Sequence, residues 1–536
     1  MKRSKLLVLT TAVLAMLLLF TACGKPASIP LKDVLLKDTT YTDSTPSYTT
    51  FEKISDLTGA TVGSTSGDLV SFSKVDTGDP TKTKISVYNI ATNSIVWSET
   101  QTATYSIDVK LNDVNYFYYQ SDAGCSYFVV KTIAPNPDDI TAKPVTTTTL
   151  YSEAGEKIVS VNRSASVENV ADLLYLDGKM YRATADGKIA YAFDYSPLAN
   201  LPDIETKYNG QYYELKEEYV AVYDSNLKFV SKYKLPVHIE DGGVVTACVV
   251  LENGNIFVQY VYAADAYSDE YDLIIEGEKY IVVTQLVDVK KGTAKQIDCE
   301  YVIDDTMNMI EWADRYKDAG INVEKMPVIG YASRIENKRV ANELVVVIDN
   351  KGNCKELGTI NGNQIDEFEF FADGSWEVYT EGSRYLVDAD GKIIGDISNA
   401  STFGKFLYAD GKIYDAKLNE VYDYYANDLT VKNTVGDSLL LAGEDGLLVL
   451  YTGSGDPITL IEKDAKKELV TVSDRWNSGS GYIIIKTGAE QFEIYNDAGT
   501  KLDTVNDVIG NSSVGFISAI KNVALVKIYT TYYRFS

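Results

Sequence analysis

The feature that most constrains the fold of this chain is a repeated strand, turn, strand pattern. In its clearest copy, Tyr385 to Ile397, two apolar stretches flank Asp388-Ala389-Asp390-Gly391. Branched and aromatic residues favour strands, whereas Asp and Gly favour the tight turn between them. Similar stretches recur at 87–97, 150–161, 181–193, 222–233, 286–297, 346–357, 413–422, 449–461 and 492–505. Such self-similarity predicts an all-β repeat architecture.

The spacing of these hairpins favours a β-propeller over residues 51–536. We expect seven or eight four-stranded blades, taking some blades to show two turns. The alternative is two smaller β domains, divided near residues 298–341.

One hairpin, Val87 to Trp97, carries a closer resemblance. Its residues Asn89, Thr92 and Trp97 are spaced as in the tryptophan-docking motif of quinoprotein-like propellers, the PQQ-like and WD40-like repeats. The resemblance implies that Trp97 packs between neighbouring blades while Asn89 and Thr92 cap the turn. It covers one blade, and we expect neither quinone chemistry nor any other cofactor.

The amino terminus resembles a bacterial lipoprotein signal. Basic residues open the chain, an uncharged apolar run fills 6–20, and Thr21 and Ala22 precede Cys23. A run of this length suits a cleaved signal better than a membrane-spanning helix. The resemblance implies that residues 1–22 are removed and that Cys23 carries diacylglycerol and a fatty acyl group such as palmitate. Two acyl chains give stable attachment, which predicts a location on the outer face of a bacterial membrane, either the cell membrane or an outer membrane.

Two further segments complete the predicted organisation. Residues 23–50 are rich in Ser, Thr, Pro and Asp, which predicts a flexible tether. Residues 306–319 have apolar side chains at helical spacing, which predicts a helical insertion near 304–320.

Composition restricts the chemistry open to this protein. The net charge is −26 at pH 7, so nucleic acid is not an expected partner. The single histidine, His238, excludes most nucleophilic triads and histidine metal sites, and we expect no metal. Four cysteines follow Cys23, and the sequence selects none of their three pairings.

The chain contains 40 tyrosines, which are frequent both on strand faces and in recognition surfaces. The most concentrated group lies in an acidic stretch that interrupts the repeat and holds Tyr262, Tyr267 and Tyr271. We predict that this stretch and the insertion with Trp312 and Tyr316 contact a ligand, because loops on rigid scaffolds often carry function.

These observations favour a membrane-anchored platform, without catalytic residues, that binds a protein, peptide or glycan or assists an envelope assembly. The rival hypothesis is a carboxylate-dependent hydrolase of an extracellular polysaccharide. Abundant Asp and Glu permit that chemistry, but one-dimensional spacing does not identify the required pair.

Overall fold

The structure is a computed structural model. It describes residues 28–35, 46–114, 125–136, 138–139, 141–184, 188–196, 200–204, 206–208, 210–216, 218–235, 243–265, 269–307, 327–371, 374–404, 406–473, 480–506, 514–520 and 522–536.

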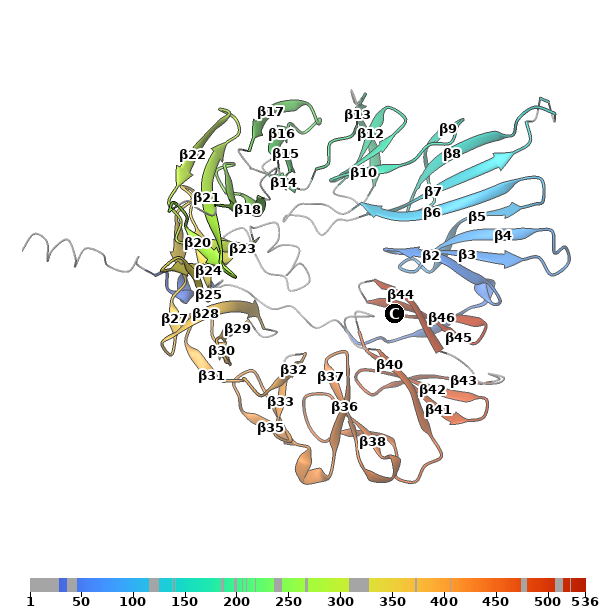
Figure 1. The fold of residues 1–536 in the computed structure, drawn as a ribbon. Helices are drawn as coiled ribbons and strands as arrows, with labels where there is room; N and C mark the ends of the chain where they lie inside the picture. Colours follow the sequence, from blue (N-terminus) through green and yellow to red (C-terminus); the bar gives the residue numbers. More distant parts are fainter. Residues whose placement is uncertain are drawn as a thin grey trace, which may run out of the picture. The chain divides into compact units, whose positions relative to one another are not determined.

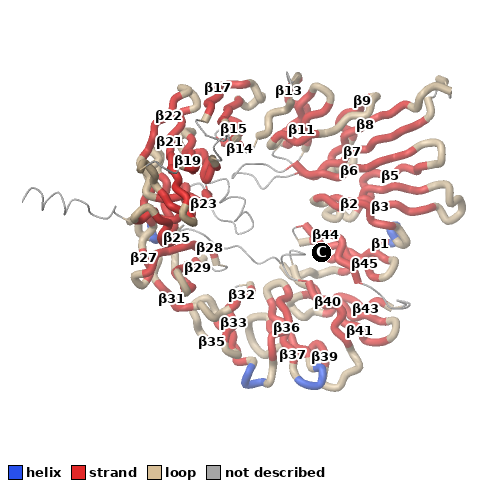
Figure 2. The backbone as a smooth tube through the Cα atoms, in the orientation of Figure 1, coloured by secondary structure: helices blue, strands red, loops and turns tan. Residues whose placement is uncertain are grey.

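The fold is a many-bladed β-propeller. The described residues form eleven antiparallel sheets, nine of four strands and two of five (Figure 1). Strands dominate the backbone, and the only helices within the described ranges are short 3-10 turns (Figure 2). These turns are η1 (Leu31–Asp33), η2 (Ser55–Leu57), η6 (Tyr425–Asn427) and η7 (Glu444–Gly446).

Contacts divide the chain into two compact units. Unit one holds described residues of Met1–Thr40, Leu215–Lys317 and Ile321–Ser398, and unit two holds those of Tyr41–Glu214 and Asn399–Ser536. The divisions after Glu214 and Ser398 do not coincide with residues 298–341, where the two-domain alternative placed the boundary.

Unit one contains three complete sheets. The first consists of β18 (Val244–Val250), β19 (Ile256–Ala263), β20 (Leu273–Ile275), β21 (Glu278–Asp288) and β22 (Thr293–Ile297). The second consists of β23 (Tyr301–Met307), β24 (Val328–Glu336), β25 (Arg339–Ile348) and β26 (Cys354–Glu356). The third consists of β27 (Thr359–Ile360), β28 (Asn363–Phe370), β29 (Trp376–Thr380), β30 (Ser383–Val387) and β31 (Ile393–Asp396).

The remaining eight sheets of the described residues each contain four antiparallel strands. Four come early in the chain: β2 (Thr61–Ser66), β3 (Leu69–Val75), β4 (Thr83–Asn89) and β5 (Ser94–Gln101); β6 (Ser106–Val114), β7 (Cys125–Ala134), β8 (Val145–Ser152) and β9 (Lys157–Val161); β10 (Glu168–Val170), β11 (Leu173–Leu176), β12 (Lys179–Ala183) and β13 (Ile189–Asp194); β14 (Thr206–Tyr208), β15 (Gln211–Leu215), β16 (Tyr219–Tyr223) and β17 (Phe229–Lys234). Three come late: β32 (Ser401–Phe403), β33 (Phe406–Ala409), β34 (Lys412–Tyr414) and β35 (Glu420–Asp423); β36 (Thr430–Val435), β37 (Ser438–Ala442), β38 (Leu448–Tyr451) and β39 (Ile458–Ile461); β40 (Glu468–Ser473), β41 (Tyr482–Gly488), β42 (Gln491–Asn496) and β43 (Lys501–Val505). The last sheet joins β1 (Phe51–Ile54) to β44 (Val514–Ile520), β45 (Val523–Ile528) and β46 (Thr531–Phe535).

The predicted hairpins are the last two strands of the blades. In the clearest copy, Asp388 Oδ1 accepts hydrogen bonds from the backbone N–H groups of Asp390 at 3.0 Å and Lys392 at 2.9 Å. Gly391 has a φ of 73°, a conformation that glycine adopts without a Cβ clash. The same aspartate-centred turn recurs at Asp224, Asp349 and Asp415. Local side-chain bonding of this kind explains why the sequence repeat is visible.

The number of sheets is larger than the predicted seven or eight. Each of the ten predicted hairpins belongs to a different sheet, and the eleventh sheet is formed by the two ends of the described chain. The prediction was too low because it assigned two hairpins to some blades.

Consecutive sheets of unit two pack face to face through apolar layers. Leu441 of β37 lies in one cluster with Phe406 of β33, and Ile484 of β41 lies in another with Phe535 of β46. These side chains are almost fully buried, and burial of one such side chain stabilises the fold by about 1.5–3 kcal/mol.

The first and last strands pair with each other. Phe51 of β1 lies opposite Phe535 of β46, and its ring stacks on Tyr533 with centroids 4.7 Å apart. Next to this strand pair, the Ser536 carbonyl accepts the backbone N–H of Thr50 at 2.8 Å. The final sheet is therefore complete only when β1 and β46 are both present.

Part of the predicted tether is packed instead of extended. Ile29 forms a bridge with Leu357, and Leu31, Val34 and Leu35 are buried. Burial of these apolar side chains outweighs the flexibility expected from the surrounding polar residues. Cys23 and the signal lie outside the described residues.

The predicted helical insertion is wrong at its start. Residues 304–307 belong to strand β23, which pairs with β24 in the second sheet of unit one. Trp312 and Tyr316 lie outside the described residues. A search of the described residues finds no helix with the length and apolar character needed to cross a membrane.

Candidate functional site

The acidic tyrosine stretch forms an extra hairpin in unit one. Strand β20 pairs with the beginning of β21, and this pairing adds a fifth strand to a sheet that otherwise follows the four-strand plan. Glu276 and Gly277 connect the two strands with φ values of 52° and 94°, as expected of a tight hairpin turn. The backbone N–H of Ile274 donates to the Lys338 carbonyl at 2.8 Å, which fixes the hairpin to the turn between β24 and β25.

The hairpin brings an aromatic ring, two lysines and two apolar side chains to one region, which we call the hairpin surface (Tyr271, Ile275, Lys279, Lys338 and Val340). The Tyr271 ring lies 3.6 Å from Lys338 Nζ and 4.8 Å from Lys279 Nζ, measured to the ring centroid. Ile275 is 42% exposed and Val340 is 46% exposed. Cation–π contacts engage the ring with both ammonium groups, while the apolar side chains remain accessible.

The other tyrosines of this stretch have different positions. Tyr262 is half-buried on β19, where its ring stacks on Tyr260 with centroids 6.2 Å apart. Tyr267 lies outside the described residues. Of the two predicted tyrosines that the structure describes, Tyr271 lies on the hairpin surface.

A group of carboxylates with perturbed titration lies elsewhere in unit one. Burial raises the pKa of Asp366 to about 6, and the charges of Glu343 and Glu381 add to the effect. Burial also raises the pKa of Asp304, with a further contribution from Glu343 and an opposing hydrogen bond from Ser333 Oγ at 3.1 Å. A carboxyl group that titrates near neutral pH beside other acids can act as a general acid.

These acids come from three different strands and one turn. Asp304 and Asp366 both occupy irregular positions, where the register of β23 against β24 and of β28 against β29 shifts. Sequence analysis missed them because Asp and Glu are abundant throughout the chain.

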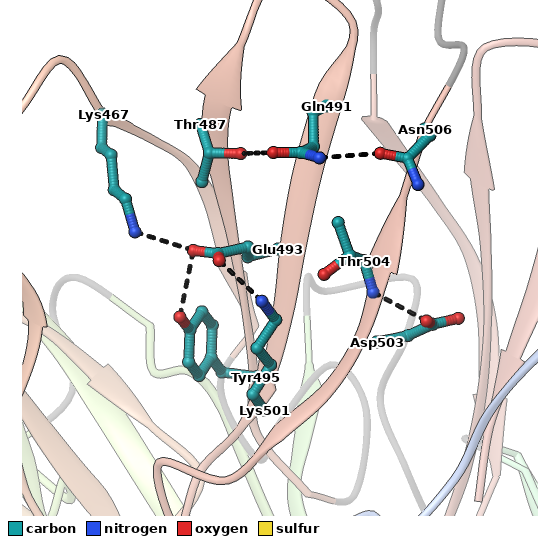
Figure 3. A network of polar contacts seen from close by, with 9 residues as sticks. All are labelled: Lys467, Thr487, Gln491, Glu493, Tyr495, Lys501, Asp503, Thr504 and Asn506. Carbon is teal, nitrogen blue, oxygen red and sulfur yellow. Dashed lines mark hydrogen bonds and ion pairs between the residues drawn. The ribbon is translucent and has the colours of Figure 1, made fainter.

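A lysine-rich polar network occupies the sheet β40–β43 of unit two (Figure 3). Glu493 lies between Lys467, at 2.9 Å, and Lys501, at 2.6 Å, and accepts a hydrogen bond from the Tyr495 hydroxyl at 3.1 Å. Burial disfavours the charged carboxylate, but the lysine hydrogen bonds outweigh it and lower the pKa of Glu493 to about 2.

A surface depression of about 360 Å³ adjoins this network. Its lining includes Lys466, Lys467, Glu468 and Lys486. The adjacent lysines at 466 and 467 are the only signal of this site in the sequence. Because Lys467 is already paired with Glu493, we interpret the network as structural support for the blade.

Of the three docking-motif residues, Asn89 and Thr92 form the hairpin turn and Trp97 contacts the next blade. Asn89 is buried, and its Oδ1 accepts the backbone N–H of Thr92 at 2.9 Å. The Trp97 ring lies 6.2 Å from Phe128 and 6.3 Å from Tyr151, both in the next sheet. Trp97 therefore contributes to the apolar layer between the sheets β2–β5 and β6–β9.

Among the described residues, no group of three or more His, Cys, Asp and Glu side chains has an arrangement that could hold a metal ion. His238 lies outside the described ranges.

No family model matches the sequence. No curated protein matches it either. Three solved structures that are similar to this chain share 9–10% sequence identity with it. The β-propeller domain of the Trilobed protease from Pyrococcus furiosus, described as having an open velcro topology, is 10% identical, with a TM-score of 0.19 and coverage of 76% of this chain and 99% of that chain. Dihydro-heme d1 dehydrogenase NirN is 10% identical, with a TM-score of 0.24 and coverage of 90% of this chain and 81% of that chain. Acylaminoacyl peptidase of Pyrococcus horikoshii is 9% identical, with a TM-score of 0.20 and coverage of 75% of this chain and 56% of that chain. At these TM-scores the fold assignment rests on the strand pairing of the chain itself.

Proposed function

We propose that this chain is a lipoprotein, anchored through Cys23 to the outer face of a bacterial membrane, whose blades form a rigid platform for a protein or peptide ligand. The observation that carries the proposal is the extra hairpin β20–β21, which departs from the four-strand plan and presents Ile275 and Val340 to solvent. The lipid anchor is supported by the signal-like residues 1–22.

The hairpin surface has properties that suit a protein ligand. The hydrogen bond from Ile274 to Lys338 holds the hairpin before any ligand binds, so little backbone entropy is lost on association. Exposed apolar residues supply burial, and the acids of the same sequence stretch favour a basic partner by electrostatic attraction. The acids of the stretch are Asp265, Asp269, Glu270, Asp272, Glu276 and Glu278.

A glycan ligand fits this surface less well. Sugars commonly stack on open aromatic faces, but the Tyr271 ring is engaged by Lys338 and Lys279. We therefore favour a protein or peptide over a glycan.

Site-specific photo-cross-linking in living cells tests the platform. A photoreactive amino acid replaces Ile275 in the full chain, and a matched chain carries it at Tyr425, which is 78% exposed in unit two. We expect a discrete cross-linked protein from position 275 and none from position 425. The replacement Ile275→Asp, tested with the probe at Val340, should abolish the product. Equal labelling from positions 275 and 425 would contradict a specific surface.

A separate experiment tests the anchor. We expect the full chain to partition into the detergent phase and to incorporate labelled palmitate, and Cys23→Ala to abolish both properties. An aqueous, unlabelled parent chain would refute the anchor without bearing on the hairpin surface.

The acid group in unit one favours a second candidate function, hydrolysis of an extracellular polysaccharide. Asp366, with its raised pKa, would serve as the general acid, and one neighbouring carboxylate would complete the pair that glycoside hydrolysis requires. The test is release of reducing ends from envelope polysaccharides by the purified full chain. Activity that is lost in Asp366→Asn and kept in Asp203→Asn would support the hydrolase over the platform.

A further inference from the structure

Two of the four cysteines that follow Cys23 lie close together. Cys299 lies in the connection between β22 and β23, and Cys354 is the first residue of β26, so both belong to unit one. Their Sγ atoms are 3.8 Å apart, although the residues are separated by 55 positions in the chain. Both side chains are half-buried and present as thiols. The sequence permitted three pairings, and the fold brings this pair into contact.

Contacts on both sides of the pair fix its position. The turn before Cys354 lies against the preceding sheet, where Asn253 Nδ2 donates to the Asn350 carbonyl at 2.8 Å. A Cβ atom at Gly352 would lie 2.3 Å from Ile297 Cδ1, which shows how closely this turn approaches β22. The two sulfurs are therefore held near each other by packing that does not depend on the thiols.

We propose that Cys299 and Cys354 are an oxidation site that forms a disulfide on exposure to a small-molecule disulfide such as oxidised glutathione. A disulfide needs the sulfurs to approach to about 2.05 Å, which small side-chain movements can supply from the present separation. The bond would join the β22–β23 connection to strand β26 covalently. The exposure of the chain to oxidants in the cell follows from the proposed outer-face location, but the chemistry does not depend on it.

The two thiols have different roles in the exchange. The hydrogen bond between them lowers the pKa of Cys299 and raises that of Cys354. The Cys299 thiolate therefore attacks one sulfur of glutathione disulfide, forming a mixed disulfide and releasing one glutathione thiolate. Cys354 then loses its proton to solvent and attacks the Cys299 sulfur, which releases the second glutathione. Two cysteine thiols are oxidised, and one glutathione disulfide is reduced to two thiols.

The test uses the full chain, purified in detergent and reduced, before and after incubation with oxidised glutathione. Free thiols are alkylated, and the digested protein is examined by mass spectrometry. We expect the loss of two alkylatable thiols and a peptide in which Cys299 is linked to Cys354. Cys354→Ser should trap glutathione on Cys299, and Cys125→Ser should leave the linkage unchanged.

Other outcomes would overturn the proposal. One is full alkylation of Cys299 and Cys354 after oxidation of a folded chain. Another is a disulfide between either residue and Cys125 or Cys248. A third is a glutathione adduct on Cys299 of the parent chain that Cys354 never displaces. Circular dichroism of each variant establishes that its fold is retained.

Discussion

Replacement of Glu493 by Gln should destabilise the sheet β40–β43 by about 1–2 kcal/mol at neutral pH. A shift of the pKa from the ordinary 4.5 to about 2 corresponds to at most about 3.4 kcal/mol of stabilisation of the charged form. The lysine partners are 33% and 43% exposed, so solvent screens both ion pairs and reduces this ceiling. Two partly exposed ion pairs and the Tyr495 hydrogen bond together account for the expected loss of about 1–2 kcal/mol.

The pH dependence identifies the charge as the cause. The pKa of Glu493 is lower in the folded chain than in the unfolded chain, so the contribution is fully present above about pH 4.5. It is lost as the pH falls from about 4.5 towards 2, because protonation then removes both ion pairs. The difference between the parent chain and Glu493→Gln should therefore shrink over this interval.

Hydrogen exchange measures this local stability without assuming that 536 residues unfold together. The free energy of opening is obtained from the amides of β42 and β43 at several pH values, each referred to the exchange of an unstructured peptide. The matched control is Glu420→Gln, which removes a more exposed ion pair with Lys412 and should cost at most about 0.5 kcal/mol. A loss in Glu493→Gln that is independent of pH, or no larger than in the control, would refute the electrostatic explanation.

Three further predictions concern other blades. Asp366→Asn should raise the thermal midpoint at pH 7 and give no gain near pH 4. The reason is that the pKa of Asp366 is raised to about 6 in the folded chain, so the folded state loses stability as the pH rises through 6. An equal gain at both pH values would contradict this prediction. Trp97→Ala should destabilise the chain by about 2–3 kcal/mol, which is less than the loss expected for replacing a fully buried tryptophan. An unchanged thermal midpoint would exclude a docking role for Trp97. Gln259→Leu should lower the stability of the fold by about 1–3 kcal/mol, because Gln259 accepts the Ile303 N–H at 2.7 Å and donates to the Tyr301 carbonyl at 2.8 Å. Hydrogen exchange of the Ile303 amide is the direct measurement, and we expect it to become faster. Full retention of the protection of this amide would contradict the prediction.

Much of the architecture could be predicted because the turns are local. Asp388 bonds to amides only two and four residues away, so the sequence of one hairpin is sufficient to specify it. The same holds at Asp224, Asp349 and Asp415, which is why the repeat was recognised. The blade number was missed because two hairpins were assigned to some blades, whereas each predicted hairpin belongs to a different sheet.

Features that depend on distant residues could not be predicted. The pKa of Asp366 depends on Glu343 and Glu381, which reach it only through folding. The proximity of Cys299 and Cys354 likewise depends on the packing of two sheets. The burial of Leu31 in the predicted tether had a weak signal, an apolar group within a polar segment, and packing within unit one decides it.

The pairing of β1 with β46 has a consequence for biosynthesis. A nascent chain emerges with its amino terminus first, so Phe51 remains without its neighbouring strand until Phe535 has been synthesised. During that interval β1 and β45 both present open strand edges, which are sites of aggregation and proteolysis. A premature stop codon that removes β46 should therefore yield a chain that is degraded, even though ten of the eleven sheets formed by the described residues are encoded intact.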